Sequence, residues 1–119
     1  MSDPGAPAPY DDVLATLPVA DLAQATAWCE FLFGRPADRT PMPSLAEWQV
    51  TSGGGVQVAE VENASAATVT LTTADLDALV AELRGRGVEV DDPTTGTGAR
   101  FTQLIDPDGN TVVLATGLD

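Results

Sequence analysis

The chain has 119 residues, of which 44% are hydrophobic, so it is long enough for one compact domain and too short for two full-sized ones. Eighteen acidic residues against five arginines give a net charge of −13, which would repel a phosphate backbone and argues against nucleic acid as a partner. No apolar run approaches the roughly 18 residues of a membrane span, and the N-terminus lacks the features of a signal peptide, so we expect a cytoplasmic protein with no membrane partner.

The first residues, 1–11, read as a flexible lead, and a single domain is expected over residues 12–119. Within that domain the segment "TLPVADL" at 16–22 returns as "TLTTADL" at 70–76, with five of seven positions identical and an offset of 54 residues. Each copy ends an apolar strand pattern and begins an amphipathic helix. The sequence therefore predicts two tandem modules, over residues 12–62 and 66–116.

Module one begins with a strand at 13–19 and continues with a helix over 21–34. Asp21 is the expected N-cap of this helix, and Gly34 is the expected stop. Two further strands are predicted at residues 45–52 and 56–62, separated by a turn of three glycines.

Module two repeats this order, with a strand at 67–73 and a helix over 75–87 that ends in glycine. The segment 91–98 is expected to be a loop. The remaining strands are predicted at residues 88–90, 99–105 and 110–116. Each module thus has the order βαβββ, and the fold class is α+β.

Neither module can bury one helix and one curved sheet face alone, so we expect the two to pair, with a concave groove in a mixed sheet and the helices outside. In the strand at 67–73, Val69 and Leu71 should pack on the helix, which leaves Thr68, Thr70 and Thr72 in the groove. The same alternation at 99–105 predicts that Phe101 and Gln103 face the groove, with their neighbours packed behind them.

Two residues of the first module are open to more than one interpretation. Trp48 could stack on a planar ligand in the groove or face the helix as a core residue, because "AEWQV" alternates ambiguously. Cys29 lies in a helical apolar pattern, where a buried core residue is favoured over a nucleophile.

The paired βαβββ modules, the strand-to-helix segment "LPVADL", the helix end "WCEFLFG" and the turn "DPDGNTVVL" together resemble the vicinal oxygen chelate superfamily. This group contains glyoxalases, bleomycin resistance proteins and ring-cleaving dioxygenases, and the resemblance covers residues 12–116. "DPDG" also resembles the start of a calcium-binding EF-hand loop, but the bidentate acid of that loop is absent.

The resemblance places the metal ligands of the superfamily, a histidine on the first strand and a glutamate on the last strand of each module, at Leu14, Thr68 and Val113. The fourth position falls near Gln57, or near Ala59 if the glycine turn shifts the register. None of these side chains replaces a histidine and carboxylate set, and the chain contains no histidine. We therefore expect no metal, no cofactor and none of the metal-dependent reactions of the superfamily.

A groove built this way is apolar with a few neutral hydrogen-bonding groups, as in a ligand pocket. No catalytic residue is assigned. Arg100 could aim at a ligand anion, although a solvated position at the rim is favoured. The predicted ligand-binding residues are Leu14, Thr16, Trp48, Gln57, Thr68, Thr70, Phe101, Gln103 and Val113.

Members of the superfamily without metal ligands resemble the bleomycin resistance proteins, which are small acidic homodimers that sequester a drug unaltered. The resemblance implies a homodimer that binds an aromatic natural product. The acidic charge is interpreted as a solubility trait of a protein from a GC-rich genome, and the other interpretation is that it attracts a cationic ligand. The alternative is a metal-free lyase, cyclase or isomerase acting on a similar molecule, with Glu47 as its acid or base. A third reading is a protein that kept only the fold, or a regulatory partner.

Overall fold

The computed structural model describes residues 13–63 and 65–117, so the expected lead at 1–11 lies outside the described residues. Its first half contains β1 (Val13–Val19), α1 (Leu22–Phe33), β2 (Arg39–Met42), β3 (Leu45–Thr51) and β4 (Gly54–Glu60). Its second half contains β5 (Thr68–Thr72), α2 (Leu76–Gly85), β6 (Thr94–Thr95), β7 (Ala99–Ile105) and β8 (Thr111–Gly117). No helix in the described ranges is long and apolar enough to cross a membrane.

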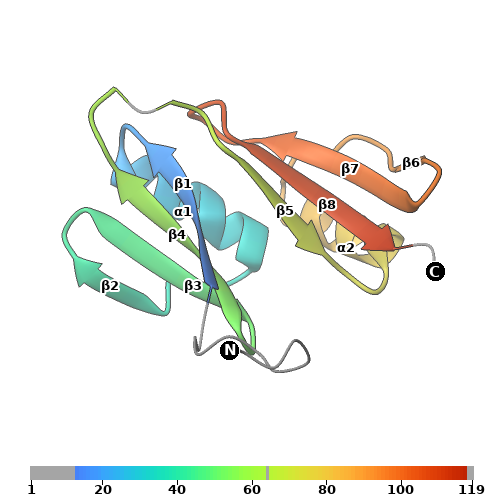
Figure 1. The fold of residues 1–119 in the computed structure, drawn as a ribbon, viewed down its shortest axis with the longest axis horizontal. Helices are drawn as coiled ribbons and strands as arrows, with labels where there is room; N and C mark the ends of the chain where they lie inside the picture. Colours follow the sequence, from blue (N-terminus) through green and yellow to red (C-terminus); the bar gives the residue numbers. More distant parts are fainter. Residues whose placement is uncertain (1–12, 64, 118–119) are drawn as a thin grey trace, which may run out of the picture.

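The strands form two four-stranded mixed sheets with the same topology, in the orders β1-β4-β3-β2 and β5-β8-β7-β6. The pairs β1–β4 and β5–β8 are parallel, and the other pairs are antiparallel. This confirms the predicted α+β class and the tandem βαβββ modules. The two sheets lie side by side, and β1 approaches β5 without a strand pair between them (Figure 1).

The repeated sequence "ADL" explains why both helices begin alike. The Asp21 carboxylate accepts a hydrogen bond from the Gln24 N–H at 3.2 Å, and the Asp75 carboxylate accepts one from the Ala78 N–H at 3.1 Å. Gly34 ends α1 in the left-handed region, at φ 75°, as its expected role requires. The two predicted helix starts are therefore confirmed.

The second strand of each module, which follows the helix, differs from the prediction. Residues 88–90 are not a strand, because the end of α2 satisfies their backbone groups: the Val88 N–H donates to the Leu83 carbonyl, and Arg84 Nη2 donates to the Val90 carbonyl at 2.7 Å. The strand of module two in this place is the short β6, inside the predicted loop at 91–98. In module one, β2 occupies a stretch where the sequence analysis placed no strand.

Both helices cover the same side of the two sheets, behind the strands in Figure 1, and the core lies between helices and sheets. We call the opposite, helix-free sides of the two sheets the open faces. The hydrophobic core joins both modules in one cluster, whose largest fully buried side chains include Trp48, Leu17, Leu76, Leu83 and Leu114.

Candidate functional site

The predicted groove residues of module two lie on the open face of its sheet. Thr70 pairs with Val113, and Val113 pairs with Gln103 across the strands, so these side chains form one row. Thr68, Thr70, Phe101 and Gln103 are exposed and Val113 is half-buried, whereas their neighbours Val69, Thr102 and Leu104 are buried on the helix side. The predicted alternation therefore agrees with the observed burial.

Module one contributes the matching row from its own sheet. Thr16 pairs with Gln57, and Gln57 pairs with Glu47. The Gln57 amide donates a hydrogen bond to the Thr16 hydroxyl at 2.7 Å, which joins the two predicted site residues. Leu14 lies further along β1 on the same face, with 37% of its surface exposed.

The strand register identifies the position that is equivalent to Val113. Adding the repeat offset of 54 to Thr16 gives Thr70, and Thr70 pairs with Val113 as Thr16 pairs with Gln57. Gln57, rather than Ala59, is therefore the counterpart of Val113 in module one.

These positions test whether the metal of the superfamily would fit here. Leu14 and Val113 offer no donor atom, Thr68 offers a neutral hydroxyl, and Gln57 offers an amide that already bonds Thr16. A divalent cation needs histidine, thiolate or carboxylate ligands in such a site. Among the residues that the structure describes, no three His, Cys, Asp or Glu side chains gather closely enough to hold an ion. The donor set does not fit a metal.

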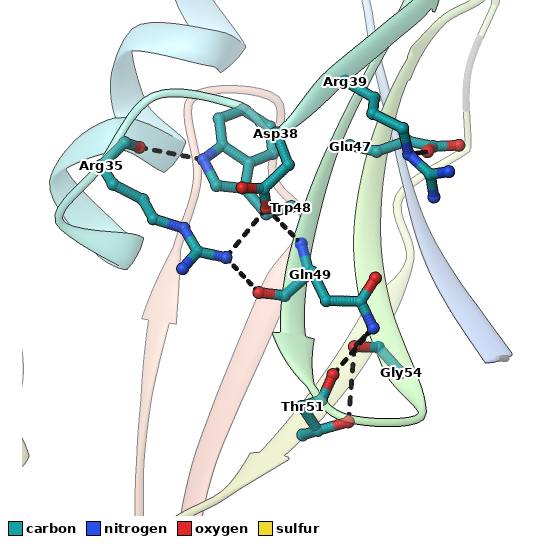
Figure 2. A network of polar contacts seen from close by, with 8 residues as sticks. All are labelled: Arg35, Asp38, Arg39, Glu47, Trp48, Gln49, Thr51 and Gly54. Carbon is teal, nitrogen blue, oxygen red and sulfur yellow. Dashed lines mark hydrogen bonds and ion pairs between the residues drawn. The ribbon is translucent and has the colours of Figure 1, made fainter.

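Trp48 does not line the groove, which corrects its place in the predicted site. The side chain is fully buried on the helix side of β3, with its ring centroid 5.7 Å from that of Phe33. Its indole N–H donates to the Arg35 carbonyl at 3.0 Å (Figure 2). Because Ala46, Glu47 and Trp48 are all buried, β3 has no clean alternation from which the side of Trp48 could be predicted.

Glu47 points to the other side of β3, where Figure 2 shows it beside Arg39. The Glu47 residue is only 8% exposed, and its Oε2 lies 3.1 Å from Arg39 Nε. The side chain thus belongs to the open face, as a candidate acid or base should, but it is held in an ion pair. Arg39 could not be predicted as a site residue, because its contact with Glu47 depends on β2, a strand that no sequence pattern indicated.

The loop between α1 and β2 is fixed against β3 by a second polar cluster, around Asp38. The Asp38 carboxylate accepts hydrogen bonds from the Gln49 N–H at 2.7 Å and from Arg35 Nη2 at 2.8 Å, and Arg35 also donates to the Gln49 carbonyl (Figure 2). The backbone N–H of Gln49, with help from the Arg35 charge, holds the pKa of Asp38 below its usual range. This cluster is structural, because its members bond one another beside Trp48.

The Arg100 guanidinium donates two hydrogen bonds to the Asp77 carboxylate, at 2.9 and 3.1 Å. It also donates one to the Thr95 hydroxyl, at 3.0 Å. The hydrogen bonds from Arg100 lower the pKa of Asp77, and they raise the pKa of Arg100. Arg100 thus ties β7 to the first turn of α2 and does not aim at a ligand anion.

Cys29 is confirmed as a core residue. Its side chain is 1% exposed on the inner face of α1, and burial, reinforced by the negative charge of Asp106, raises the pKa of its thiol to about 12. A thiol in this state is not a nucleophile.

The sequence analysis also missed a pocket of about 310 Å³ where the two modules meet. Its walls come from the C-terminal end of α1, the end of β3, β5 and α2. We call it the seam pocket. No local pattern could reveal it, because its walls come together only when the modules dock.

Comparison with solved structures gives high similarity over most of the chain. The crystal structure of a glyoxalase/bleomycin resistance protein from Catenulispora acidiphila DSM 44928 shares 32% identity, with a TM-score of 0.81 and coverage of 88% of this chain and 96% of that one. A bleomycin-binding protein complexed with bleomycin shares 19% identity, with a TM-score of 0.75 over 89% of this chain and 98% of that one.

TnmS3, an antibiotic-binding protein from Streptomyces sp. CB03234, shares 24% identity, with a TM-score of 0.74 over 95% of this chain and 98% of that one. At these lower identities the last two proteins show a shared fold. No curated protein matches the sequence at a significant level. The profile of one family matches residues 11–114, nearly the whole chain. The chain therefore belongs to the Glyoxalase/Bleomycin resistance protein/Dioxygenase superfamily.

Proposed function

We propose that this protein binds an aromatic natural product or antibiotic in a groove formed by its open faces, without a metal and without altering the ligand. The observation that carries the proposal is the row Thr70–Val113–Gln103 and its counterpart Thr16–Gln57. These rows present neutral hydroxyl, amide and alkyl groups, and Val113 and Gln57 within them stand at positions where the superfamily places metal ligands. Such a surface suits recognition by shape and a few hydrogen bonds. Self-resistance of a producer organism is the proposed context.

The open faces need a cover before they can enclose a ligand. Leu14 and Phe101 lie on these faces with 37% and 43% of their surfaces exposed, and the edge strands β2 and β6 pair on one side only. We propose a symmetric homodimer, in which module one of one subunit faces module two of the other and two equivalent grooves form. Light scattering at micromolar concentration tests this: a dimer mass is expected, and a monomer mass would contradict it.

The charge of the protein predicts how a cationic ligand would bind. On the open face Arg39 is paired with Glu47, on the helix side Arg100 is paired with Asp77, and the chain carries a net charge of −13. Affinity for a cationic ligand should fall as the salt concentration rises from about 0.01 to about 0.15 M, because the screening length contracts from about 30 to about 8 Å. If the affinity does not change with salt concentration, the net charge contributes to solubility and not to ligand binding.

Calorimetric titration with bleomycin and with an anthraquinone tests the proposal directly. Binding at micromolar affinity or better is expected for the wild type, and Val113→Trp should abolish it by filling the row that Thr70 and Gln103 share. Val61→Trp is the matched control, because Val61 is an exposed valine outside both sheets. Equal affinity in Val113→Trp and Val61→Trp would place the ligand elsewhere.

The second candidate is a metal-free lyase, cyclase or isomerase, and the position of Glu47 favours it. This carboxylate lies in the row of Thr16 and Gln57, and a ligand that displaced Arg39 would free it as an acid or base. Mass spectrometry of the ligand after incubation separates the two functions. Recovery of unaltered ligand supports binding alone, whereas a product that disappears in Glu47→Gln would establish the enzyme.

A further inference from the structure

The seam pocket combines apolar walls with no charged side chain. Leu32, Phe33 and Val50 line it from module one, and Leu79, Leu83 and Leu114 line it from module two. The remaining lining residues are one leucine and threonines. At about 310 Å³ the pocket lies at the lower end of the range of small-molecule sites, and its lining favours a neutral apolar occupant.

One side of the pocket follows the backbone of β5. Four consecutive residues, 70–73, line it, although the side chains of successive strand residues point to opposite faces. A pocket that contacts all four therefore runs along the edge of the strand. β5 is an edge strand, and no strand of residues 13–63 or 65–117 pairs with its outer side.

The hydrogen-bond register shows which backbone groups of β5 face the pocket. The Thr111 N–H donates to the Ala67 carbonyl, and the Thr73 N–H donates to the Ala115 carbonyl, both at 2.9 Å. In a parallel pair, alternate residues bond to the partner strand, so the odd-numbered residues of β5 face β8. Thr70 and Thr72 therefore direct their N–H and C=O groups outward, toward module one and the pocket.

We propose that the seam pocket is a second binding site, separate from the open faces, for a small neutral apolar molecule that carries an adjacent N–H donor and C=O acceptor, as in a lactam or a secondary amide. The ring system lies between the two modules, against Phe33, Val50 and Leu79. Its polar edge bonds the backbone of Thr70 or Thr72. Because both modules line the pocket, occupancy also stabilises their docking.

The bicyclic lactam 2-quinolone is the probe, followed by amide NMR shifts of the full-length protein. We expect saturable shifts at Val50 and Thr72, on the two sides of the seam, without shifts at Phe101 and Gln103 on the open face. The analogue 1-methyl-2-quinolone keeps the ring and the carbonyl but has no N–H, and it should bind about tenfold more weakly. Shifts that map to Phe101 and Gln103 would overturn the proposal.

Four substitutions complete the test. Leu79→Trp fills the pocket from α2 and should remove 2-quinolone binding, whereas Leu22→Trp, at another half-buried leucine on α1 outside the pocket, should not. Thr51 is exposed at the rim, so Thr51→Trp should close the pocket without disturbing the core. This variant provides the same test if Leu79→Trp does not fold.

Val113→Trp blocks the open face and should leave 2-quinolone binding unchanged, so this site and the proposed groove can fail independently. Wild-type affinity in Leu79→Trp and Thr51→Trp, or no saturation at millimolar probe, would refute the seam site.

Discussion

Asn110 donates a hydrogen bond from Nδ2 to the carbonyl of Pro18, at 2.8 Å and across 92 positions of the sequence. Its Oδ1 accepts from the Ala67 N–H at 2.7 Å, and Nδ2 also donates to the Asp106 carboxylate. The Asn110 side chain is fully buried. In this protein the DPDGN turn therefore connects the end of β1 in module one to the start of β5 in module two.

Asn110→Ala should destabilise the fold strongly. The substitution leaves the Pro18 carbonyl, the Ala67 N–H and one Asp106 oxygen without their partner, and each unsatisfied buried group costs about 1–3 kcal/mol. With partial relaxation we expect a loss of about 3 kcal/mol in the free energy of unfolding, measured by urea denaturation.

The control for this experiment is Thr111→Val, next in the sequence, which keeps the branched strand side chain and should change stability by about 0.5 kcal/mol or less. A loss below about 1 kcal/mol in Asn110→Ala would show that water replaces the three bonds and that the turn does not hold the modules together.

Gly34 and Arg86 form a second connection between the modules. Arg86 Nη1 donates to the Phe31 carbonyl at the end of α1, at 3.2 Å, and a Cβ on Gly34 would lie 2.2 Å from the same nitrogen. Gly34→Ala should therefore cost about 1–2 kcal/mol from its positive φ and also displace Arg86. In an Arg86→Ala background Gly34→Ala should cost only the strain of its positive φ. In a double-mutant cycle the loss of stability of the double variant should therefore be smaller than the sum of the two single losses. Strict additivity would mean that Arg86 does not contribute.

The modules could be predicted because their sequence features are local. "TLPVADL" and "TLTTADL" each contain a strand end, an aspartate cap and a helix start, and both caps are observed at Asp21 and Asp75. The alternation of Thr68 to Thr72 was equally clear, because one face is buried and the other is exposed.

What the sequence did not show depends on partners far along the chain. β2 consists of four exposed residues without alternation, and it is a strand only because its backbone pairs with β3. The ion pair of Arg39 with Glu47 was missed for the same reason. Trp48 lies on the helix side of β3, where its ring packs near Phe33 and its indole N–H donates to the Arg35 carbonyl. No local sequence pattern predicts either contact.

Cys29 predicts a pH dependence of stability. Burial raises the pKa of the Cys29 thiol from its ordinary value of 9.0 to about 12, so its contribution to stability is complete below about pH 9 and is lost as the pH rises toward 12. The free energy of unfolding should fall by roughly 1.4 kcal/mol per pH unit above pH 9. Urea unfolding between about pH 8 and about pH 10.5 measures it, and Cys29→Ala should lack this slope. The same slope in Cys29→Ala would assign the effect to other groups.

The last prediction concerns metal. Elemental analysis of the purified protein should find no stoichiometric zinc, nickel, manganese or iron, and a chelator should leave the melting temperature unchanged, because Leu14, Gln57, Thr68 and Val113 do not provide a ligand set.

The positive control restores the pattern that the superfamily implies, with Leu14→His, Gln57→Glu, Thr68→His and Val113→Glu in one variant. If these positions meet in the proposed dimer, the variant should gain a metal ion and a higher melting temperature in its presence, since an ion that binds only the folded state stabilises it. A metal in the wild type would overturn the assignment of these positions. A fourfold variant that folds as a dimer but binds no metal would show that the two modules do not face each other as proposed.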